Sequence, residues 1–409
     1  MAASAGVNGV VNGVSSVEDD LPPPQDVSLP VKPGGVERFS EILREAEIEN
    51  GYNGRSKTIP SNLLKHPAKV DVSDHLAENQ ETSLTFQIND KFQQLQPAPD
   101  TAQLRARFCA KIQRILDEAW PGKEIEAHLF GSSINGLGTI SSDVDICLTT
   151  PWQDKGQGVS NMNILGMVLR KHGMTKVYTV GKAKVPICKF FDPEYHLSCD
   201  VNVNNTIALR NTILIKMYVE IDPRVKPLMM VIKHWTRRRV LNDAAKGGTL
   251  SSYCWVMMVI FFLQTRPIPI LPCLHEMYLD RLRNGEKVER VVVDGVDCSF
   301  HEDITTVRDY GIRNHETLGA LFFAFFRLFA VVFDYDNSVV SVRHGRYLTK
   351  EEKGWNVDVE RMCRWFCVEE PFNPQRNLAN SADGVSVAGL RKEFERAVGI
   401  LARGGDLEE

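Results

Sequence analysis

Two aspartates, Asp143 and Asp145, stand two residues apart in the stretch FGSSINGLGTISSDVDICL, which runs from Phe130 to Leu148. Residues i and i+2 of a strand point to the same face, so the two carboxylates are expected to lie side by side. Like charges this close repel each other, and a divalent cation that prefers oxygen ligands, such as Mg²⁺ or Mn²⁺, is the usual compensation. The glycine–serine turn upstream supplies the free N–H groups that a phosphate site needs. The alternative is a solvated edge strand that carries two acids.

A third carboxylate follows on a later predicted strand, residues 196–203. Alternation along this strand places Asp200 on the polar face with Ser198 and Asn202, and no other acid shares that face. Three carboxylates on neighbouring strands are the minimum set for a two-metal site, in which one ion activates an attacking hydroxyl. Asp200 alone would be interpreted as a solvated strand residue. Together with the first pair it completes a metal-binding set.

The periodicity of the chain predicts the elements that hold these residues. Apolar residues recur at helical spacing over 83–96 and 101–119, and short alternating runs predict strands after them. The strands are predicted at 124–130, 144–148, 175–180, 185–191 and 196–203, with a helix at 161–171. Pro186 lies near the start of its strand and favours an edge position, because proline lacks the N–H that a central strand uses.

Beyond residue 204 the pattern is helical almost to the end of the chain. Helices are predicted at 206–217, 223–239, 250–264, 319–333 and 385–401. Two of these, 250–264 and 319–333, are almost wholly apolar but shorter than the roughly 20 residues that span a bilayer. Both are therefore predicted to be buried core helices, and no membrane partner is expected.

Composition sets the limits of the interpretation. The chain has 409 residues, 43% hydrophobic and 24% charged, and a net charge of -4, so a nucleic-acid partner must meet a local basic patch. Nine scattered cysteines without a CxxC pair indicate reduced thiols, and the N-terminus lacks the pattern of a signal peptide. A cytoplasmic protein is the expectation. Residues 1–82 are rich in Gly, Ser, Pro and Asn and are predicted to be mostly disordered, with a short helix at 36–48.

Polar groups stand out in the helical half. Asn211 and Thr212 lie on an otherwise apolar helix, and the run KHWTRRR carries Lys233 and Arg237. Lysine is a compact point charge for phosphate, whereas arginine offers a fork of donors. A solvated helix end that complements the helix dipole would show the same run. The loop EEPFNPQR, which includes Glu370, is stiffened by two prolines, and an ordinary surface loop is its alternative interpretation.

These blocks, in this order, resemble the RNA-specific terminal nucleotidyltransferases of the DNA polymerase β-like superfamily, the group of terminal uridylyltransferases and cytoplasmic poly(A) polymerases. The resemblance covers about residues 83–402. It rests on Gly131-Ser132 followed by Asp-x-Asp, on Asp200, and on the blocks NNTIALRNT, VIKHW, GTLSSY and EEPFN. It implies an α+β fold of two domains. These are a polymerase β-like nucleotidyltransferase domain with a mixed sheet at 101–203, and a mostly helical poly(A)-polymerase-associated central domain at 83–100 and 204–402, with a nucleotide-recognition loop at 369–380 and a tail at 403–409.

The resemblance also implies a role for each matching residue. Asp143, Asp145 and Asp200 would bind two Mg²⁺ or Mn²⁺ ions, with Asp200 nearest the 3′-hydroxyl of the RNA. A nucleoside triphosphate is the substrate, held by the turn, by phosphate contacts, by ribose contacts, by a stacking aromatic and by the recognition loop. The positions implied are Phe130, Gly131 and Ser132 at the turn, Lys233, Arg237 and Ser252 at the phosphates, Asn211 and Thr212 at the ribose, Tyr253 as the stacking aromatic, and Glu370, Asn373 and Arg376 in the recognition loop.

The choice of base is expected to rest on the recognition loop. Uridine-preferring members keep a histidine six residues after the acid of this block, and here that position is Arg376. Arginine only donates and a carboxylate only accepts, so Arg376 with Glu370 suits cytosine, which offers O2 and N3 acceptors and an amino donor. The loop looks most like the CutA-type enzymes of fungi, which add C and U to RNA ends. CTP preference with use of UTP is the expectation, and adenine fits the same polarity.

Other activities remain as alternatives. A poly(A)- or poly(U)-adding member of the same family is one, and an inactive RNA- or protein-binding scaffold is another, disfavoured because all three aspartates are present. Oligoadenylate synthases and aminoglycoside nucleotidyltransferases share the glycine–serine start but not the helical blocks. The expected partners are a single-stranded RNA 3′ end and, through the N-terminal segment, mRNA-decay factors. A monomer is expected.

Overall fold

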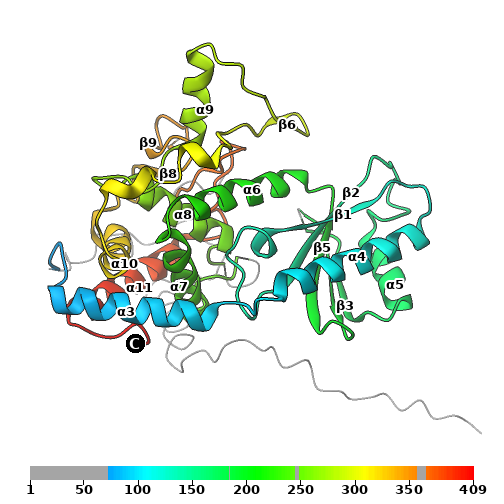
Figure 1. The fold of residues 1–409 in the computed structure, drawn as a ribbon, viewed down its shortest axis with the longest axis horizontal. Coiled ribbons are helices and arrows are strands. Elements are labelled where there is room, and N and C mark those ends of the chain that lie inside the picture. The colour runs from blue at the N-terminus through cyan, green and yellow to red at the C-terminus, as the bar shows by residue number, and fades with distance from the viewer. Residues whose placement is uncertain (1–71, 184, 245–247, 357–364) are drawn as a thin grey trace, which may run out of the picture.

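The computed structural model describes residues 72–183, 185–244, 248–356 and 365–409. The helix predicted at 36–48 lies outside these ranges. Figure 1 shows a sheet with helices α4 and α5 at one end of the molecule and a group of helices at the other. The molecule is therefore an α+β protein with a mixed sheet, as the sequence predicts.

The sheet contains five strands in the order β1-β2-β5-β4-β3. They are β1 (Glu126–Phe130), β2 (Val144–Thr149), β3 (Thr175–Val180), β4 (Ile187–Asp192) and β5 (Leu197–Val203). β2 and β5 run parallel and the other pairs are antiparallel. The prediction that Pro186 marks an edge strand is wrong, because β4 lies between β5 and β3. Pro186 precedes the first residue of β4, so its missing N–H costs the ladder nothing.

Helices α4 (Thr101–Ala119) and α5 (Met162–Lys171) cover one face of the sheet. Phe108 and Ile112 of α4 are buried in one cluster with Val144 and Ile146 of β2. This packing uses the alternate residues of β2, so the intervening residues face away from both helices. Asp145, an intervening residue of β2, therefore lies on the opposite face, and so does its ladder partner Asp200.

The helical part contains a larger hydrophobic core. Its helices are α3 (Glu78–Leu95), α6 (Thr206–Ile221), α7 (Val225–Arg238), α8 (Ser252–Gln264), α9 (Leu274–Arg283), α10 (Leu318–Arg327) and α11 (Gly384–Ala402). Two hairpins accompany them, β6 (Val292–Val293) with β7 (Val296–Asp297) and β8 (Ser338–Ser341) with β9 (Arg346–Thr349). Although α3 precedes the sheet in sequence, its Leu84, Ile88 and Leu95 are buried in this helical core.

The two apolar segments are core helices over most of their length. α8 is buried almost throughout, and the predicted helix 319–333 divides into α10 and a π-helical turn, η4 (Leu328–Val332). Within the described ranges, no single helix has the length and apolar character of a membrane span. One pair, Ile304–Arg313 with Leu318–Val332, meets both criteria together across a bend of 85°.

Both ends of the predicted ordered region need correction. α3 begins at Glu78 rather than Ser83. Its first turn is polar, so the apolar periodicity does not mark it, and the side chain of Gln80 accepts a hydrogen bond from the N–H of Ala77. Residues 403–409, predicted as a tail, pack on the helical part. There Glu408 forms an ion pair with Lys91 at 2.7 Å. Charged residues that look solvated in sequence are thus held by partners from distant helices.

Candidate functional site

One cavity of about 670 Å³ lies where the acidic face of the sheet meets the helical part. Every site residue predicted from the sequence lines it, namely Phe130, Gly131, Ser132, Asp143, Asp145, Asp200, Asn211, Thr212, Lys233, Arg237, Ser252, Tyr253, Glu370, Asn373 and Arg376. Residues far apart in the chain are therefore neighbours in space. The cavity has a carboxylate end on the sheet and a loop end at residues 369–377.

At the carboxylate end, Asp145 of β2 and Asp200 of β5 are direct partners in the parallel ladder. Side chains of paired residues point to the same face, so both carboxylates enter the cavity. Gly131 lies against them with φ at +61°, and a Cβ there would stand 2.7 Å from Oδ2 of Asp145. Only glycine combines this backbone conformation with the close approach of the turn to the acid.

The carboxylate end carries excess negative charge. Burial, followed by the charges of Asp200 and Asp143, raises the pKa of Asp145 to about 7. Several cations oppose this charge, and sequence reasoning missed two of them. Lys189 of β4 forms an ion pair with Asp200, and Arg105 of α4 is buried behind the acids, where its Nη2 donates to the carbonyl of Ser142 at 3.1 Å. Their positions depend on tertiary packing, and no local motif marks them.

The chemistry of the carboxylate end fits divalent cations. Three carboxylates line one cavity, and burial together with the charges of Asp200 and Asp143 favours the protonated form of Asp145, which a bound cation would oppose. Hard oxygen donors of this kind suit Mg²⁺ or Mn²⁺. Among the residues that the structure describes, no three acidic, His or Cys side chains already surround one point. Asp200 is instead engaged by Lys189.

The glycine–serine turn is fixed to the helical part by Thr212 of α6. The Thr212 hydroxyl accepts a hydrogen bond from the N–H of Gly131 at 2.9 Å and donates one to the carbonyl of Ala208 at 2.8 Å. Thr212 is buried, and its hydroxyl is used in both directions. The sequence predicted a ribose contact for this residue. The structure gives it a further role, because it sets the distance between the turn and α6.

Cations line the wall between the two ends. Lys233 of α7 is buried, and its Nζ donates to the carbonyl of Leu137 at 3.0 Å. Burial and the neighbouring charge of Arg237 lower the pKa of Lys233 to about 8, whereas Asp145 opposes the shift. Lys233 and Arg237 together give the cavity a cationic wall, which suits the anionic groups of a triphosphate.

At the loop end, Tyr253 lies at the centre of a hydrogen-bonded group. Its hydroxyl is 2.8 Å from Oδ1 of Asn211 and 2.9 Å from Oε1 of Glu370. The other oxygen of Glu370 accepts hydrogen bonds from the backbone N–H groups of Phe372, at 2.9 Å, and Asn373. Glu370 therefore holds both the aromatic ring and the turn of the loop. With 2% of its surface exposed, it offers little to a ligand directly.

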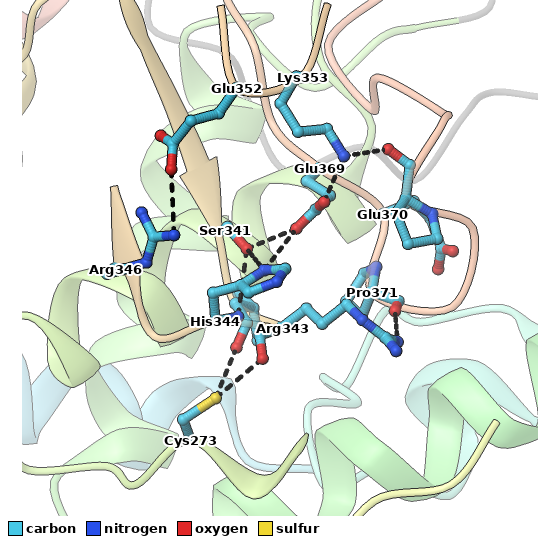
Figure 2. Close-up of polar contacts among 12 residues, drawn as sticks. Cys273, Ser341, Arg343, His344, Arg346, Glu352, Lys353, Glu369, Glu370 and Pro371 are labelled. Atoms are coloured by element: carbon cyan, nitrogen blue, oxygen red, sulfur yellow. Dashed lines mark hydrogen bonds and ion pairs between the residues drawn. The ribbon is translucent and has the colours of Figure 1, made fainter. Parts of the chain in front are cut away.

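A buried ion pair lies beneath the loop and was not predicted. Figure 2 shows Glu369 facing Lys353, Ser341 and His344. Lys353 Nζ is 2.6 Å from Glu369 Oε1 and also donates to the carbonyl of Pro374 at 2.6 Å. Consecutive glutamates thus point to opposite sides, Glu370 to the cavity and Glu369 to the interior.

A second cation supports the same loop. Arg343, between β8 and β9, donates from its Nη1 to the carbonyl of Pro371 at 2.8 Å. Lys353 and Arg343 therefore hold two carbonyl groups of one short loop. The acidic pair in the block EEPFN is the only sequence signal for this arrangement, and it does not identify the distant cations.

Arg376 closes the loop and is exposed at the cavity. Its carbonyl accepts from the N–H of Glu370 at 3.1 Å, and its own N–H donates to the carbonyl of Asn373 at 2.9 Å. The guanidinium forms no hydrogen bond or ion pair with any residue that the structure describes. Its backbone is thus fixed while its donors remain available to a ligand.

Comparison with known proteins identifies relatives of both parts. Residues 84–220 match the family model described as the central palm domain of mitochondrial-like poly(A) RNA polymerase. Residues 317–376 match the model of Cid1 family poly A polymerase. The chain is 44% identical to the poly(A) RNA polymerase cid13 of Schizosaccharomyces pombe, over 73% of this chain and 50% of cid13. It therefore spans half the length of that relative.

Two further relatives cover more of their own length. The poly(A) RNA polymerase cid11 of Schizosaccharomyces pombe is 35% identical over 88% of this chain and 71% of cid11. A solved structure of the Cid1 poly(U) polymerase, a histidine-to-asparagine variant bound to MgATP, superposes with a TM-score of 0.67. It is 27% identical and covers 78% of this chain and 95% of its own.

Proposed function

The chain belongs to the Cid1 family of poly(A) polymerases, a family of RNA nucleotidyltransferases, and we propose that it adds nucleotides to RNA 3′ ends without a template, preferring CTP and also using UTP. One observation carries the proposal. A single cavity joins three carboxylates, a cationic wall and an aromatic ring beside a rigid loop. These are the parts that phosphoryl transfer to a hydroxyl and selection of a base require.

The proposed reaction is an in-line displacement. The 3′-oxygen of the RNA forms a bond to the α-phosphorus of the nucleotide, the bond from that phosphorus to pyrophosphate breaks, and Asp200 takes the hydroxyl proton. Lys233 and Arg237 bind the outer phosphates and stabilise the negative charge of the departing pyrophosphate. The turn of Gly131 and Ser132 cradles the triphosphate, and Thr212 keeps that turn at its fixed distance from α6.

Asp143, Asp145 and Asp200 would hold two divalent cations. When bound, these ions lower the pKa of the attacking hydroxyl and neutralise charge on the reacting phosphates. The solved Cid1 variant was bound to MgATP, which supports a magnesium–nucleotide substrate for this chain as well. Burial and the neighbouring charges of Asp200 and Asp143, which raise the pKa of Asp145, supply the physical reason for cation binding.

Base choice is assigned to Arg376. Its guanidinium can donate to O2 and N3 of cytosine, and uracil offers only its O2 and O4 carbonyls as acceptors because its N3 carries a proton. Tyr253 supplies the ring on which the base stacks. Glu370 is assigned to positioning rather than to direct contact with the base, and its hydrogen bonds to Tyr253 and to the loop backbone support this assignment. In the cell, such tails would mark mRNA for decay in the cytoplasm.

ATP is the second candidate substrate. Both cid13 and cid11 are poly(A) RNA polymerases, and they are similar to this chain over most of its length. The N1 acceptor and amino donor of adenine match the polarity of the loop end as well. Adenine differs from cytosine mainly in size, so competition between the two nucleotides decides between these candidates.

The test is extension of labelled RNA and DNA primers by the purified chain, with each nucleotide alone and then with CTP and ATP in competition. Reactions contain Mg²⁺ or Mn²⁺, and a chelator serves as the control. The proposal predicts metal-dependent extension of RNA, fastest with CTP and slower with UTP. Equal or faster use of ATP would replace the CTP assignment, and no transfer to RNA would overturn the proposed activity.

A further inference from the structure

One row of paired residues crosses the whole sheet and passes through the carboxylate end of the cavity. Phe130 pairs with Asp145, Asp145 with Asp200, Asp200 with Lys189, and Lys189 with Tyr178. Residues paired in this way point to the same face of a sheet. The row therefore continues from the catalytic carboxylates of β2 and β5 across β4 to the edge strand β3.

The outer half of this row is open to solvent. Asp200 and Val185 line the cavity, whereas Lys189 and Tyr178, the next residues of the row, do not. The Tyr178 ring is 64% exposed, and the Lys189 side chain is 47% exposed. Helix α5 lies on the other face, where a Cβ on Gly166 would contact Thr179. No described helix packs over the face that carries Tyr178 and Lys189.

Aromatic and cationic side chains alternate on this open face. Phe191 of β4 has the Lys176 Nζ over its ring at 5.2 Å, and the ring of His196 lies 6.3 Å from that of Phe191. Tyr178 and Lys189 extend the same surface toward Asp200. Among the described residues of β3, β4 and β5, Asp200 is the only acid on this face.

We propose that this face, defined by Tyr178, Lys189, Phe191 and Lys176 and called here the sheet track, binds the 3′-terminal segment of the acceptor RNA. The inference rests on the proposed function, which places the 3′-hydroxyl at Asp200. The terminal nucleotide lies at Asp200, Lys189 and Lys176 contact the phosphates behind it, and the preceding bases stack on Tyr178 and Phe191. Single-stranded nucleic acid is held in this way by interleaved cations and aromatic rings.

Charge and geometry favour RNA as the occupant. The nucleotide enters on the side of Lys233 and Tyr253, so the acceptor must reach Asp200 from another direction. The sheet track begins at Asp200 and leads away from the helical part toward the sheet edge. A chain of net charge -4 needs a local basic surface to hold RNA, and the track provides one next to the reacting group.

The test compares two exposed aromatic residues by steady-state extension at saturating nucleotide and Mg²⁺, with RNA concentration varied. Tyr178→Ala is expected to raise the KM for RNA by about five- to 100-fold, from the loss of stacking on one base, with kcat and the KM for the nucleotide unchanged. Tyr178→Phe keeps the ring and should stay near wild type. Phe86→Ala, which removes an aromatic residue that is 74% exposed on α3, is the matched control.

Two further measurements locate the RNA. Lys176→Gln should reduce the slope of log affinity against log salt by about 0.7, the value for one phosphate of a single strand. Thiouridine placed at the second position from the 3′ end should crosslink to the segment that contains β3 and β4. Crosslinks only to the helical part, or a Tyr178→Ala enzyme that matches Phe86→Ala, would overturn the sheet track. If the wild-type chain extends RNA in the same assay, that result leaves the proposed function intact.

Discussion

The two ends of the cavity treat buried negative charge in opposite ways. At the carboxylate end, burial and the charges of Asp200 and Asp143 raise the pKa of Asp145 to about 7. Beneath the loop end, burial would also raise the pKa of Glu369, but hydrogen bonds from His344, Lys353 and Ser341 lower it below the usual value. The carboxylate end thus holds several carboxylates whose charges repel one another, whereas Glu369 has a partner at each of its oxygens.

This difference assigns the reaction to the carboxylate end of the cavity and the selection of the base to the loop end. Clustered carboxylates attract cations from solution and can release them, which suits catalysis by bound metal ions. A paired carboxylate binds nothing further but fixes the backbone around it, which suits a loop that must present one residue at a constant position. Variants at each end can test whether the carboxylate end serves the reaction and the loop end serves base selection.

The largest effect is expected from the carboxylates of the sheet. Asp145→Asn and Asp200→Asn each remove a proposed metal ligand, and because metal ions stabilise the transition state by several kcal/mol, extension should fall at least about 10³-fold. Thermal unfolding should show that both variants remain folded. Asp117→Asn, an exposed position on α4, is the matched control and should retain full activity. Substantial extension by Asp145→Asn would remove this residue from the metal site.

The buried pair beneath the loop should dominate stability. Lys353→Met leaves the Glu369 carboxylate buried without its lysine partner, and such a loss typically lowers the free energy of unfolding by about 3–5 kcal/mol. The double variant, Lys353→Met with Glu369→Gln, should lose less than the sum of the losses in the two single variants. Urea denaturation of the four chains measures the coupling.

The surface pair of Arg346 and Glu352, also drawn in Figure 2, is the matched control. Its side chains are 55% and 44% exposed, so the same cycle should give less than about 1 kcal/mol. Similar coupling in both pairs would contradict the claim that the loop rests on a buried charge. Loss of discrimination between CTP and UTP in Lys353→Met is expected as well.

The dependence of stability on pH should have opposite signs at the two ends in the metal-free chain. Asp145 binds protons more tightly folded than unfolded, so its contribution falls as pH rises from about 4 to about 7, by up to about 1.4 kcal/mol per pH unit. Glu369 has a lowered pKa, so its contribution is present above the unfolded value and is lost on acidification.

Unfolding free energies of wild type, Asp145→Asn and Glu369→Gln, measured across this range with chelator present, isolate the two contributions. The excess stability of wild type over Asp145→Asn should decline with rising pH, and that over Glu369→Gln should grow. Parallel curves for all three chains would show that the two carboxylates do not differ in their charge balance.

The smallest effect concerns the contact that joins the two ends. Thr212→Val keeps the shape of the side chain but leaves the N–H of Gly131 without its acceptor, a loss of about 1–3 kcal/mol if the group stays buried. The KM for the nucleotide should rise with it, since the turn is no longer held to α6. Thr179→Val, which removes an exposed hydrogen bond to Asn163, should change neither quantity. Equal effects of Thr212→Val and Thr179→Val would show that the loss comes from introducing valine and not from losing the contact with Gly131.

The carboxylate end was predictable because its signal is local. Asp143 directly precedes β2 and Asp145 lies on it, and the alternation that exposes Asp200 can be read over a few residues. The sequence could not show that Asp200 faces Lys189, since the order β2-β5-β4 depends on pairing between distant segments. The same limit explains Pro186, whose strand is central although the residue favours an edge.

The loop end was predictable only through the resemblance. Tyr253 and Glu370 are 117 positions apart in sequence, yet their side chains meet at 2.9 Å. Nothing in the chain near Glu369 indicates that Lys353 approaches from another element, because a lysine at that position is ordinary in sequence. Buried ion pairs and loop supports of this kind arise from tertiary packing, which local periodicity does not encode.

The most direct test of the account measures rate and base choice together. Wild type, Asp145→Asn and Arg376→His are compared on one RNA primer with CTP and with UTP. Asp145→Asn should lose both rates without altering their ratio, whereas Arg376→His should retain extension and shift the ratio toward UTP. An Arg376→His enzyme that keeps the wild-type ratio, or an Asp145→Asn enzyme that changes it, would contradict the division of the cavity into a reacting end and a selecting end.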